Sequence, residues 1–147
     1  MTKESEIVFD ATDAIVGRLC AKAMKEALNG KTVTILNAEK AVISGSAVNL
    51  KALFMARRGV QQKSNPEHSP VWPRRPDLLF KKIISGMAPK KKQSGAMALK
   101  RVKIYLGVPK EFAGKTAEKY GVKLSFPRAG RTTLKELCIL LGWTATV

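Results

Sequence analysis

The sequence predicts an α/β protein of one domain, and three observations support this prediction. An apolar, β-prone segment at residues 6–10 is followed by helical spacing of apolar residues over 13–29 and by a second apolar segment at 32–36. Strand, helix and strand in this order form a βαβ unit with a right-handed crossover. The 147 residues, of which 45% are hydrophobic, suffice for one domain, residues 1–147, with a substantial core.

The first helix is expected to have one apolar face. Its apolar positions are Val16, Leu19, Cys20, Ala23, Met24 and Ala27. Asp13 is a candidate N-cap, and Asn29-Gly30 a C-terminal cap. The strand at 32–36 lacks strict alternation of apolar and polar residues, as expected when both faces of a sheet are covered.

Two further strands and a second helix are predicted in the middle of the chain. Residues 41–43 form a short apolar strand, and Ser46 can cap the helix that follows. One face of that helix contains Leu50, Leu53, Phe54 and Arg57. Residues 102–106 alternate Val102, Ile104 and Leu106 with Lys103 and Tyr105, which predicts the fourth strand.

The remaining elements are a long loop and three shorter helices. Residues 60–75 form an irregular loop, and long loops in compact domains are often functional. Pro76 suits the first position of a helix, and another short helix is expected over 94–101. Thr133 to Glu136 is a capping box that opens a final helix ending at Gly142. Its apolar face contains Leu134, Leu137, Cys138 and Leu141.

Positive charge is concentrated between Arg57 and Lys103. The chain has a formal net charge of +16 and a pI near 10.2, while its first 50 residues contain as many acids as bases. Between positions 57 and 103, only Glu67 and Asp77 oppose the bases. Like charges repel in a compact fold, so this gradient indicates a polyanionic partner. The predicted RNA-binding residues of this basic segment are Arg57, Arg58, Lys63, Arg74, Arg75, Lys81, Lys82, Lys90, Lys91, Lys92, Lys100, Arg101 and Lys103.

Residue type suggests how these bases would act. Lys90 to Lys92 follow Pro89, which bars continuation of a helix, so they are expected at a corner that meets closely spaced phosphates. The four arginines at 57, 58, 74 and 75 have planar guanidinium groups suited to phosphate oxygens and to stacking on unpaired bases. Trp72 could stack on a base or anchor the loop on the protein, and the sequence favours neither.

Other classes of protein fit the sequence poorly. No apolar run approaches the roughly 18 residues of a membrane span, and the N-terminus lacks the apolar core of a signal peptide, so a cytosolic protein is expected. Cys20 and Cys138 lie among apolar residues, where they are expected to be buried and unpaired. A single histidine, His68, and the absence of a Cys-x-x-Cys motif argue against a metal site.

The enzyme interpretation depends on nucleotide motifs or on carboxylates. Gly-Lys-Thr occurs at 30–32 and 114–116, but Lys25 and Pro109 occupy the positions where a phosphate-binding loop needs glycine. A metal-dependent enzyme that processes nucleic acids is the alternative, with Asp10, Asp13 and Glu39 as metal ligands. A strand end, a helix cap and a local charge partner account for the same three residues more simply.

Several blocks resemble a known family. Asp10-Ala11 with Gly17-Arg18-Leu19, the block from Leu36 to Gly45, and Gly86 to Lys90 with Lys100 to Pro109 are similar to the signatures of ribosomal protein L13 of the large subunit. The block from Thr133 to Glu136 and the closing Leu141-Gly142-Trp143 resemble its archaeal branch. Ala88 stands where the family usually has leucine, and the loop at 60–73 matches least.

The resemblance implies both a fold and a function. The expected fold has three layers, α/β/α, around a four-stranded parallel sheet, with the basic helices and loop as an extension. The expected function is that of a structural protein which binds large-subunit ribosomal RNA, contacts neighbouring ribosomal proteins and supports early subunit assembly. The resemblance implies no catalytic activity and no cofactor, metal, small-molecule substrate or membrane. The expected location is the ribosome in the cytoplasm. Arg18, in the first block, joins the predicted RNA-binding residues.

Overall fold

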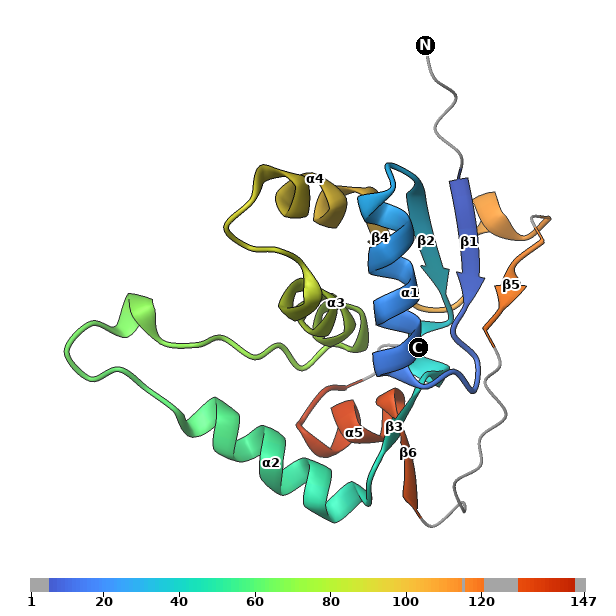
Figure 1. Cartoon of the computed structure of the whole chain (residues 1–147). Coiled ribbons are helices and arrows are strands. Elements are labelled where there is room, and N and C mark those ends of the chain that lie inside the picture. Colours follow the sequence, from blue (N-terminus) through green and yellow to red (C-terminus); the bar gives the residue numbers. More distant parts are fainter. Residues whose placement is uncertain (1–5, 115, 121–129, 145–147) are drawn as a thin grey trace.

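The computed structural model of the chain describes residues 6–114, 116–120 and 130–144. Its centre is a four-stranded parallel sheet with the order β4-β2-β1-β5 (Figure 1). Strand β1 (Glu6–Asp10) pairs along its whole length with β2 (Thr32–Leu36). Strand β4 (Val102–Ile104) lies on the other side of β2, and β5 (Glu118–Lys119) lies beside β1. The predicted four-stranded parallel sheet is confirmed.

One predicted strand belongs elsewhere. Strand β3 (Val42–Ser44) pairs antiparallel with β6 (Arg131–Thr133) in a separate two-stranded sheet. Only the short 3-10 helix η1 (Ala38–Lys40) separates β2 from β3, whereas a parallel neighbour needs a crossover of a dozen residues or more. The place expected for β3 in the main sheet is taken by β5, a strand too short to show a periodic pattern.

Helix α1 (Val16–Leu28) presents the expected face to the core. Its six predicted apolar residues are all buried, and their spacing accounts for the phase of the helix. The predicted cap is wrong, because the N-cap residue is Ile15, without a side-chain hydrogen bond. Asp13 instead has a φ of 56°, a left-handed turn conformation that is incompatible with the extended backbone of an N-cap.

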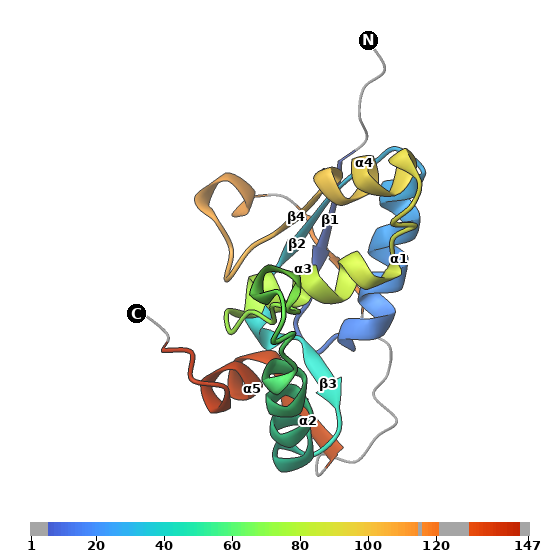
Figure 2. The ribbon, with the colours of Figure 1, turned by 90° about the vertical axis from the view of Figure 1, so that its left-hand side faces the viewer.

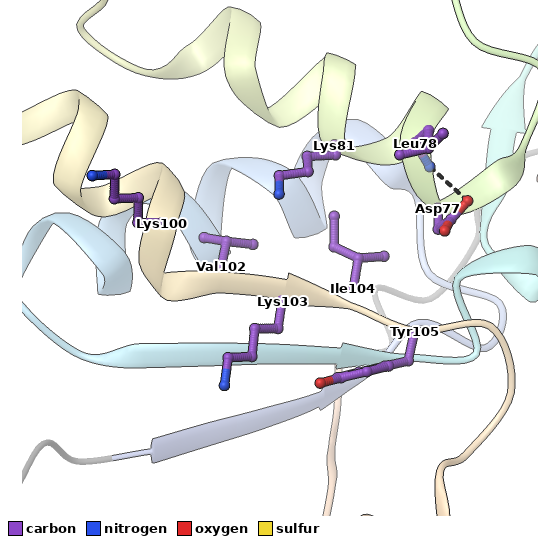
Figure 3. Close-up of a pocket in the computed structure, with 8 residues that line it drawn as sticks. All are labelled: Asp77, Leu78, Lys81, Lys100, Val102, Lys103, Ile104 and Tyr105. Atoms are coloured by element: carbon purple, nitrogen blue, oxygen red, sulfur yellow. Dashed lines mark hydrogen bonds between the residues drawn. The ribbon is translucent and has the colours of Figure 1, made fainter.

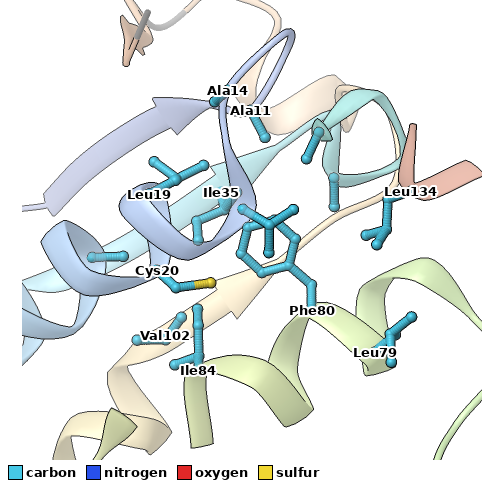
Figure 4. Packing of buried hydrophobic residues seen from close by; sticks show 14 of the residues in the cluster. Ala11, Ala14, Leu19, Cys20, Ile35, Leu79, Phe80, Ile84, Val102 and Leu134 are labelled. Atoms are coloured by element: carbon cyan, nitrogen blue, oxygen red, sulfur yellow. The ribbon is translucent and has the colours of Figure 1, made fainter. Parts of the chain in front are cut away.

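Helices α1, α3 (Pro76–Met87) and α4 (Gln93–Arg101) cover one face of the main sheet (Figure 2). The core between them includes Leu19, Ile35, Phe80, Ile84 and Val102 (Figure 4). Ala88, the position that departs from the family pattern, is buried in the same cluster.

A thinner layer lies on the opposite face. The 3-10 helix η3 (Lys110–Phe112) places Phe112 against Val8 and Leu36, with the Tyr105 ring 5.8 Å from that of Phe112. Alternate residues of β1 and β2 therefore meet different partners: Phe9 and Ile35 face the helices, whereas Val8 and Leu36 face η3.

Helix α2 (Ala47–Gly59) extends away from the main sheet and continues into the long loop with its 3-10 helix η2 (Pro66–His68), as Figure 1 shows. The Ser46 side chain accepts a hydrogen bond from Asn49 N, so the predicted cap is confirmed. Leu50 and Phe54 are buried, but Leu53, predicted on the same face, is exposed. The apolar stripe of α2 is narrow because, among the described residues, only one side of this projecting helix has neighbours.

Helix α5 (Leu134–Leu140) begins at the predicted capping box. Thr133 N donates to Glu136 Oε2 at 3.1 Å, and Glu136 N donates to Thr133 Oγ1 at 3.2 Å. The four predicted apolar residues are buried, and Gly142 follows the helix with a φ of 89°.

Burial raises the pKa of the Cys20 and Cys138 thiols to about 12, so both are un-ionised at neutral pH.

Candidate nucleic-acid interface

Lysines from three elements surround a hollow at the free edge of β4 (Figure 3). Lys81 comes from α3, Lys100 from α4 and Lys103 from β4 itself. In the close-up, Lys81 and Lys100 lie on one side of the strand and Lys103 with Tyr105 on the other. The hollow measures about 330 Å³ and is lined further by Asp77, Leu78, Val102 and Ile104. Because Lys81 is far from the other two lysines in sequence, only the fold gathers the three.

Asp77 does not cancel this positive charge, because its carboxylate is already engaged. Arg75 Nη2 and Nε donate to its two oxygens at 2.8 and 3.2 Å, and Leu78 N donates to it at 2.8 Å. Among the residues that the structure describes, Arg75 is the only predicted RNA-binding residue that forms an ion pair. Within the described residues, the lysines that line the hollow therefore have no acidic side chain as an ion-pair partner.

A second group of bases lies where the long loop returns to the fold. The Trp72 ring meets that of Phe54 edge-on, with centroids 5.9 Å apart. The Arg57 guanidinium lies 5.1 Å from the Trp72 centroid, and Lys82 Nζ lies 5.7 Å from it. Trp72 thus anchors the loop on α2, which is one of the two roles that the sequence left open.

Lys90, Lys91 and Lys92 form the turn between α3 and α4, where all three are exposed. Lys92 N donates to the Pro89 carbonyl at 3.1 Å, which closes the turn. Gly95 packs directly on the same carbonyl: a Cβ at this position would lie 2.4 Å from Pro89 O. The predicted corner of three lysines is therefore present and held by close backbone packing.

The other predicted bases are scattered. Arg58 Nη1 donates to the Leu141 carbonyl at 3.3 Å, and Arg74 lies beside Gly142, so both are close to the end of α5. Lys63 is exposed in the loop, and Arg101 is half-buried at the end of α4.

Arg18 belongs to a different surface, on the outer face of α1. It lines a hollow together with Lys22, Lys25 and Tyr120. Lys22 Nζ lies 4.9 Å from the Tyr120 centroid. Lys22 and Lys25, which are not among the predicted RNA-binding residues, follow Arg18 at helical spacing, so the three bases form one stripe on α1.

The carboxylates proposed as metal ligands have structural partners. Asp10 Oδ1 accepts hydrogen bonds from Thr12 N at 3.1 Å, Thr12 Oγ1 at 2.8 Å and Asn37 Nδ2 at 3.0 Å. Glu39 accepts from Gly107 N at 3.0 and 3.2 Å. No group of three histidine, cysteine or acidic side chains that could hold a metal ion occurs among the described residues.

These bonds join the blocks on which the family resemblance was based. Asn37 N donates to the Gly107 carbonyl, and Ala38 N to the Tyr105 carbonyl. The ends of β1, β2 and β4 are thereby tied together at one edge of the sheet. Burial raises the pKa of Asp10, but its bonds to Asn37 and Thr12 and the charge of Lys119 outweigh burial and hold that pKa below its usual value.

Fold and charge together define a basic α/β protein with lysines gathered at an open strand edge and at a helix corner. A protein-family model described as "Ribosomal protein L13" matches residues 4–111. The chain belongs to the ribosomal protein L13 family.

Archaeal relatives agree with this assignment. The large ribosomal subunit protein uL13 of Methanosarcina barkeri is 43% identical over 106 residues, which cover 71% of this chain and 73% of the relative. The protein of the same name from Archaeoglobus fulgidus is 38% identical over 112 residues, covering 76% and 70%. That of Methanopyrus kandleri is 36% identical over 107 residues, covering 73% and 65%. These relatives are named as ribosomal proteins and not as enzymes.

None of the helices in the described part of the chain has both the length and the hydrophobicity that a membrane span requires.

Proposed function

We propose that this chain is a structural constituent of the large ribosomal subunit, where it binds large-subunit ribosomal RNA and supports early assembly. Family membership and the concentration of positive charge both support this function. The observation that carries it is the gathering of Lys81, Lys100 and Lys103, from three elements, around one hollow without a free acid in the described residues. Its partners are the RNA and neighbouring ribosomal proteins, in the cytoplasm.

The predicted RNA-binding residues would act mainly through phosphates. Each lysine or arginine that neutralises a phosphate releases condensed counterions, so affinity depends steeply on salt. Helices α3 and α4, held on the sheet by the core, present these charges in a fixed arrangement. The protein would contribute positioning and charge neutralisation to the particle, and no chemical step.

Co-sedimentation tests the assignment to a particle. In a sucrose gradient of cell lysate, the protein should sediment with the large ribosomal subunit. It should also stay bound to the large-subunit RNA after the neighbouring ribosomal proteins have been removed. Sedimentation with chromosomal DNA instead would contradict the proposed function and indicate a DNA-packaging protein.

Salt dependence tests the interface itself. Changing Lys90, Lys91 and Lys92 together to alanine should weaken binding to large-subunit RNA. The slope of log affinity against log salt concentration should become less steep by about 0.7–0.9 for each phosphate that is no longer neutralised. A matched control changes Lys51, Lys110 and Lys135, three exposed lysines outside the segment from Arg57 to Lys103, and removes the same charge. Equal effects of the two triple variants would show that net charge, and not this corner, determines binding.

A further inference from the structure

An apolar groove adjoins the lysine-lined hollow at the edge of β4. It measures about 340 Å³ and is lined by Val71, Pro73, Leu78 and Leu99, with Lys81, Lys82 and Ser85 at its side. Val71 is 75% exposed and Leu78 is 48% exposed. Apolar side chains gathered at this level of exposure, beside charged residues, often mark a binding site.

The anchoring of Trp72 explains why this groove exists. The Trp72 ring packs on Phe54, while the flanking Val71 and Pro73 line the groove. The same packing that fastens the loop therefore holds two apolar residues toward α3 and α4.

The groove and the hollow are neighbouring compartments, and the hollow contains more of the positive charge. Leu78 and Lys81 line both of them, so the two meet at one turn of α3. The groove is floored by aliphatic side chains, whereas the hollow combines Lys81, Lys100 and Lys103 with apolar residues and with Asp77, which is paired with Arg75. A ligand with a flat apolar group and an anion a short distance apart would match both.

We propose that the two compartments together bind one unpaired nucleotide of the ribosomal RNA. Its base would lie on the floor of Val71, Pro73, Leu78 and Leu99, and its phosphate would lie among the lysines at the β4 edge. This inference rests on the proposed function and names the form of RNA that the site takes. Ser85 is the one uncharged polar side chain that the described residues contribute to the groove, so the site would accept any base through its face and would not read its edge.

An acidic peptide with apolar residues is the competing ligand, and the surroundings favour RNA. From Lys82, at the side of the groove, positive charge continues to Arg57 and to the corner of Lys90 to Lys92, on neighbouring elements. A nucleic-acid strand carries one charge per nucleotide along its whole path, so it can engage all of these positions, whereas a short peptide segment engages a few.

The test uses the intact protein and a short single-stranded RNA in which one base is replaced by the fluorescent analogue 2-aminopurine, with the corresponding duplex for comparison. The groove variants are Val71→Ser and Leu78→Ser, and the control is Val48→Ser, a residue 77% exposed on α2. Circular dichroism checks that each variant is folded, which is expected because these side chains are exposed. The hollow is probed by the double variant Lys100→Gln with Lys103→Gln.

The two kinds of variant should differ in their salt dependence. Each groove variant should bind the single strand about tenfold more weakly, because the base no longer rests on an apolar side chain, and its salt slope should be unchanged. The lysine variant should lower that slope by about 0.7 for each phosphate left without its cation. Binding of wild-type protein should change the 2-aminopurine fluorescence, and Val48→Ser should behave as wild type.

Binding of the wild type to large-subunit RNA is measured in parallel. If it binds that RNA but the groove variants bind the single strand as tightly as wild type, the inference is overturned and the proposed function stands. If wild type does not bind large-subunit RNA, the proposed function fails and this inference with it. A peptide of glutamate and leucine residues tests the competing ligand. If this peptide displaces the single-stranded RNA, binds more tightly than the RNA and binds the groove variants more weakly than wild type, the inference is overturned in favour of a protein partner.

Discussion

Gly95 and Gly86 show how the same residue type in two neighbouring helices can have opposite roles. Gly95 lies in α4 against the Pro89 carbonyl, where a Cβ would meet backbone atoms at 2.4 and 2.9 Å. Gly86 lies in α3, where a Cβ would meet no other part of the described chain within 4 Å. Close approach of two backbones therefore requires glycine at one site and not at the other.

Substitution by alanine should change stability in opposite directions. Gly95→Ala should destabilise the protein by about 1–3 kcal/mol, because the backbone at the corner must shift. Gly86→Ala should stabilise it by about 0.5 kcal/mol, since alanine loses less entropy in a helix. Urea unfolding of the two variants measures both effects. A stabilised Gly95→Ala protein would mean that α4 does not pack on Pro89 as closely as described.

Asp10 should make the folded protein less stable at acid pH. Its pKa in the folded protein is lower than the ordinary value of 3.8, because hydrogen bonds from Asn37 and Thr12 favour the carboxylate more than burial disfavours it. A lowered pKa adds stability that is complete above the unfolded value and is lost as the pH falls through the folded value. Between about pH 5 and about pH 2.5, wild type should therefore lose more free energy of unfolding than Asp10→Asn. Parallel curves for the two proteins would contradict this role.

At the scale of elements, the loop at 60–75 joins a projecting helix to the body of the fold. Local bonds hold its outer part. Two involve side chains: Gln62 N donates to Ser69 Oγ at 3.0 Å, and Glu67 N donates to Asn65 Oδ1 at 3.2 Å. Backbone bonds from His68 N and Ser69 N close the turn of η2. Both side-chain bonds are exposed, and residues 61–68 bury none of their side chains. Trp72 is the first residue after this stretch that packs on the core cluster.

We predict that the outer part of this loop is mobile in the free protein and becomes ordered on RNA. Ordering a residue costs about 1–2 kcal/mol, which the few bonds of residues 61–68 do not offset without phosphates. Amide hydrogen exchange should be fast across 61–68 in the free protein and slower in the RNA complex. Trp72→Ala should extend fast exchange to residues 70–75. Strong protection of 61–68 without RNA would show that the loop is preformed.

At the scale of the whole molecule, one core cluster connects α1, α3, α4 and α5 with the main sheet. Leu19, Met24, Val33 and Ile35 are buried in this cluster, and Ile104 packs against it half-buried. Two leucines of α1 can thus differ completely in environment: Leu19 is 0% exposed, while Leu28 is 43% exposed.

Truncation of these two leucines should separate core from surface. Leu19→Ala should cost about 2–5 kcal/mol because burial is reduced and a cavity forms, whereas Leu28→Ala should cost less than about 1 kcal/mol. Denaturant unfolding measures both, and reaction of Cys20 and Cys138 with a thiol reagent gives an independent signal, because both buried thiols react only after unfolding. Equal costs for the two leucines would show that the phase of α1 is wrong.

Local patterns were sufficient to predict much of this protein. Helical spacing predicts the buried face of α1, the β1-α1-β2 order follows from three adjacent segments, and Thr133 with Glu136 predicts the start of α5. The charge gradient, a property of composition, predicts a polyanionic partner. These features depend on residues within a few positions of one another, and for that reason they are visible in the sequence.

Only the tertiary structure decided which distant residues meet. The pairing of β3 with β6, the use of β5 as the fourth strand and the bonds of Asp10 and Glu39 depend on segments far apart in the chain. Lys81, Lys100 and Lys103 come from three elements and share a hollow only because α3 and α4 pack beside the free edge of β4. A strand of two residues such as β5 carries no periodic signal. The meeting of distant segments is set by the packing of the whole core, so no local pattern could reveal it.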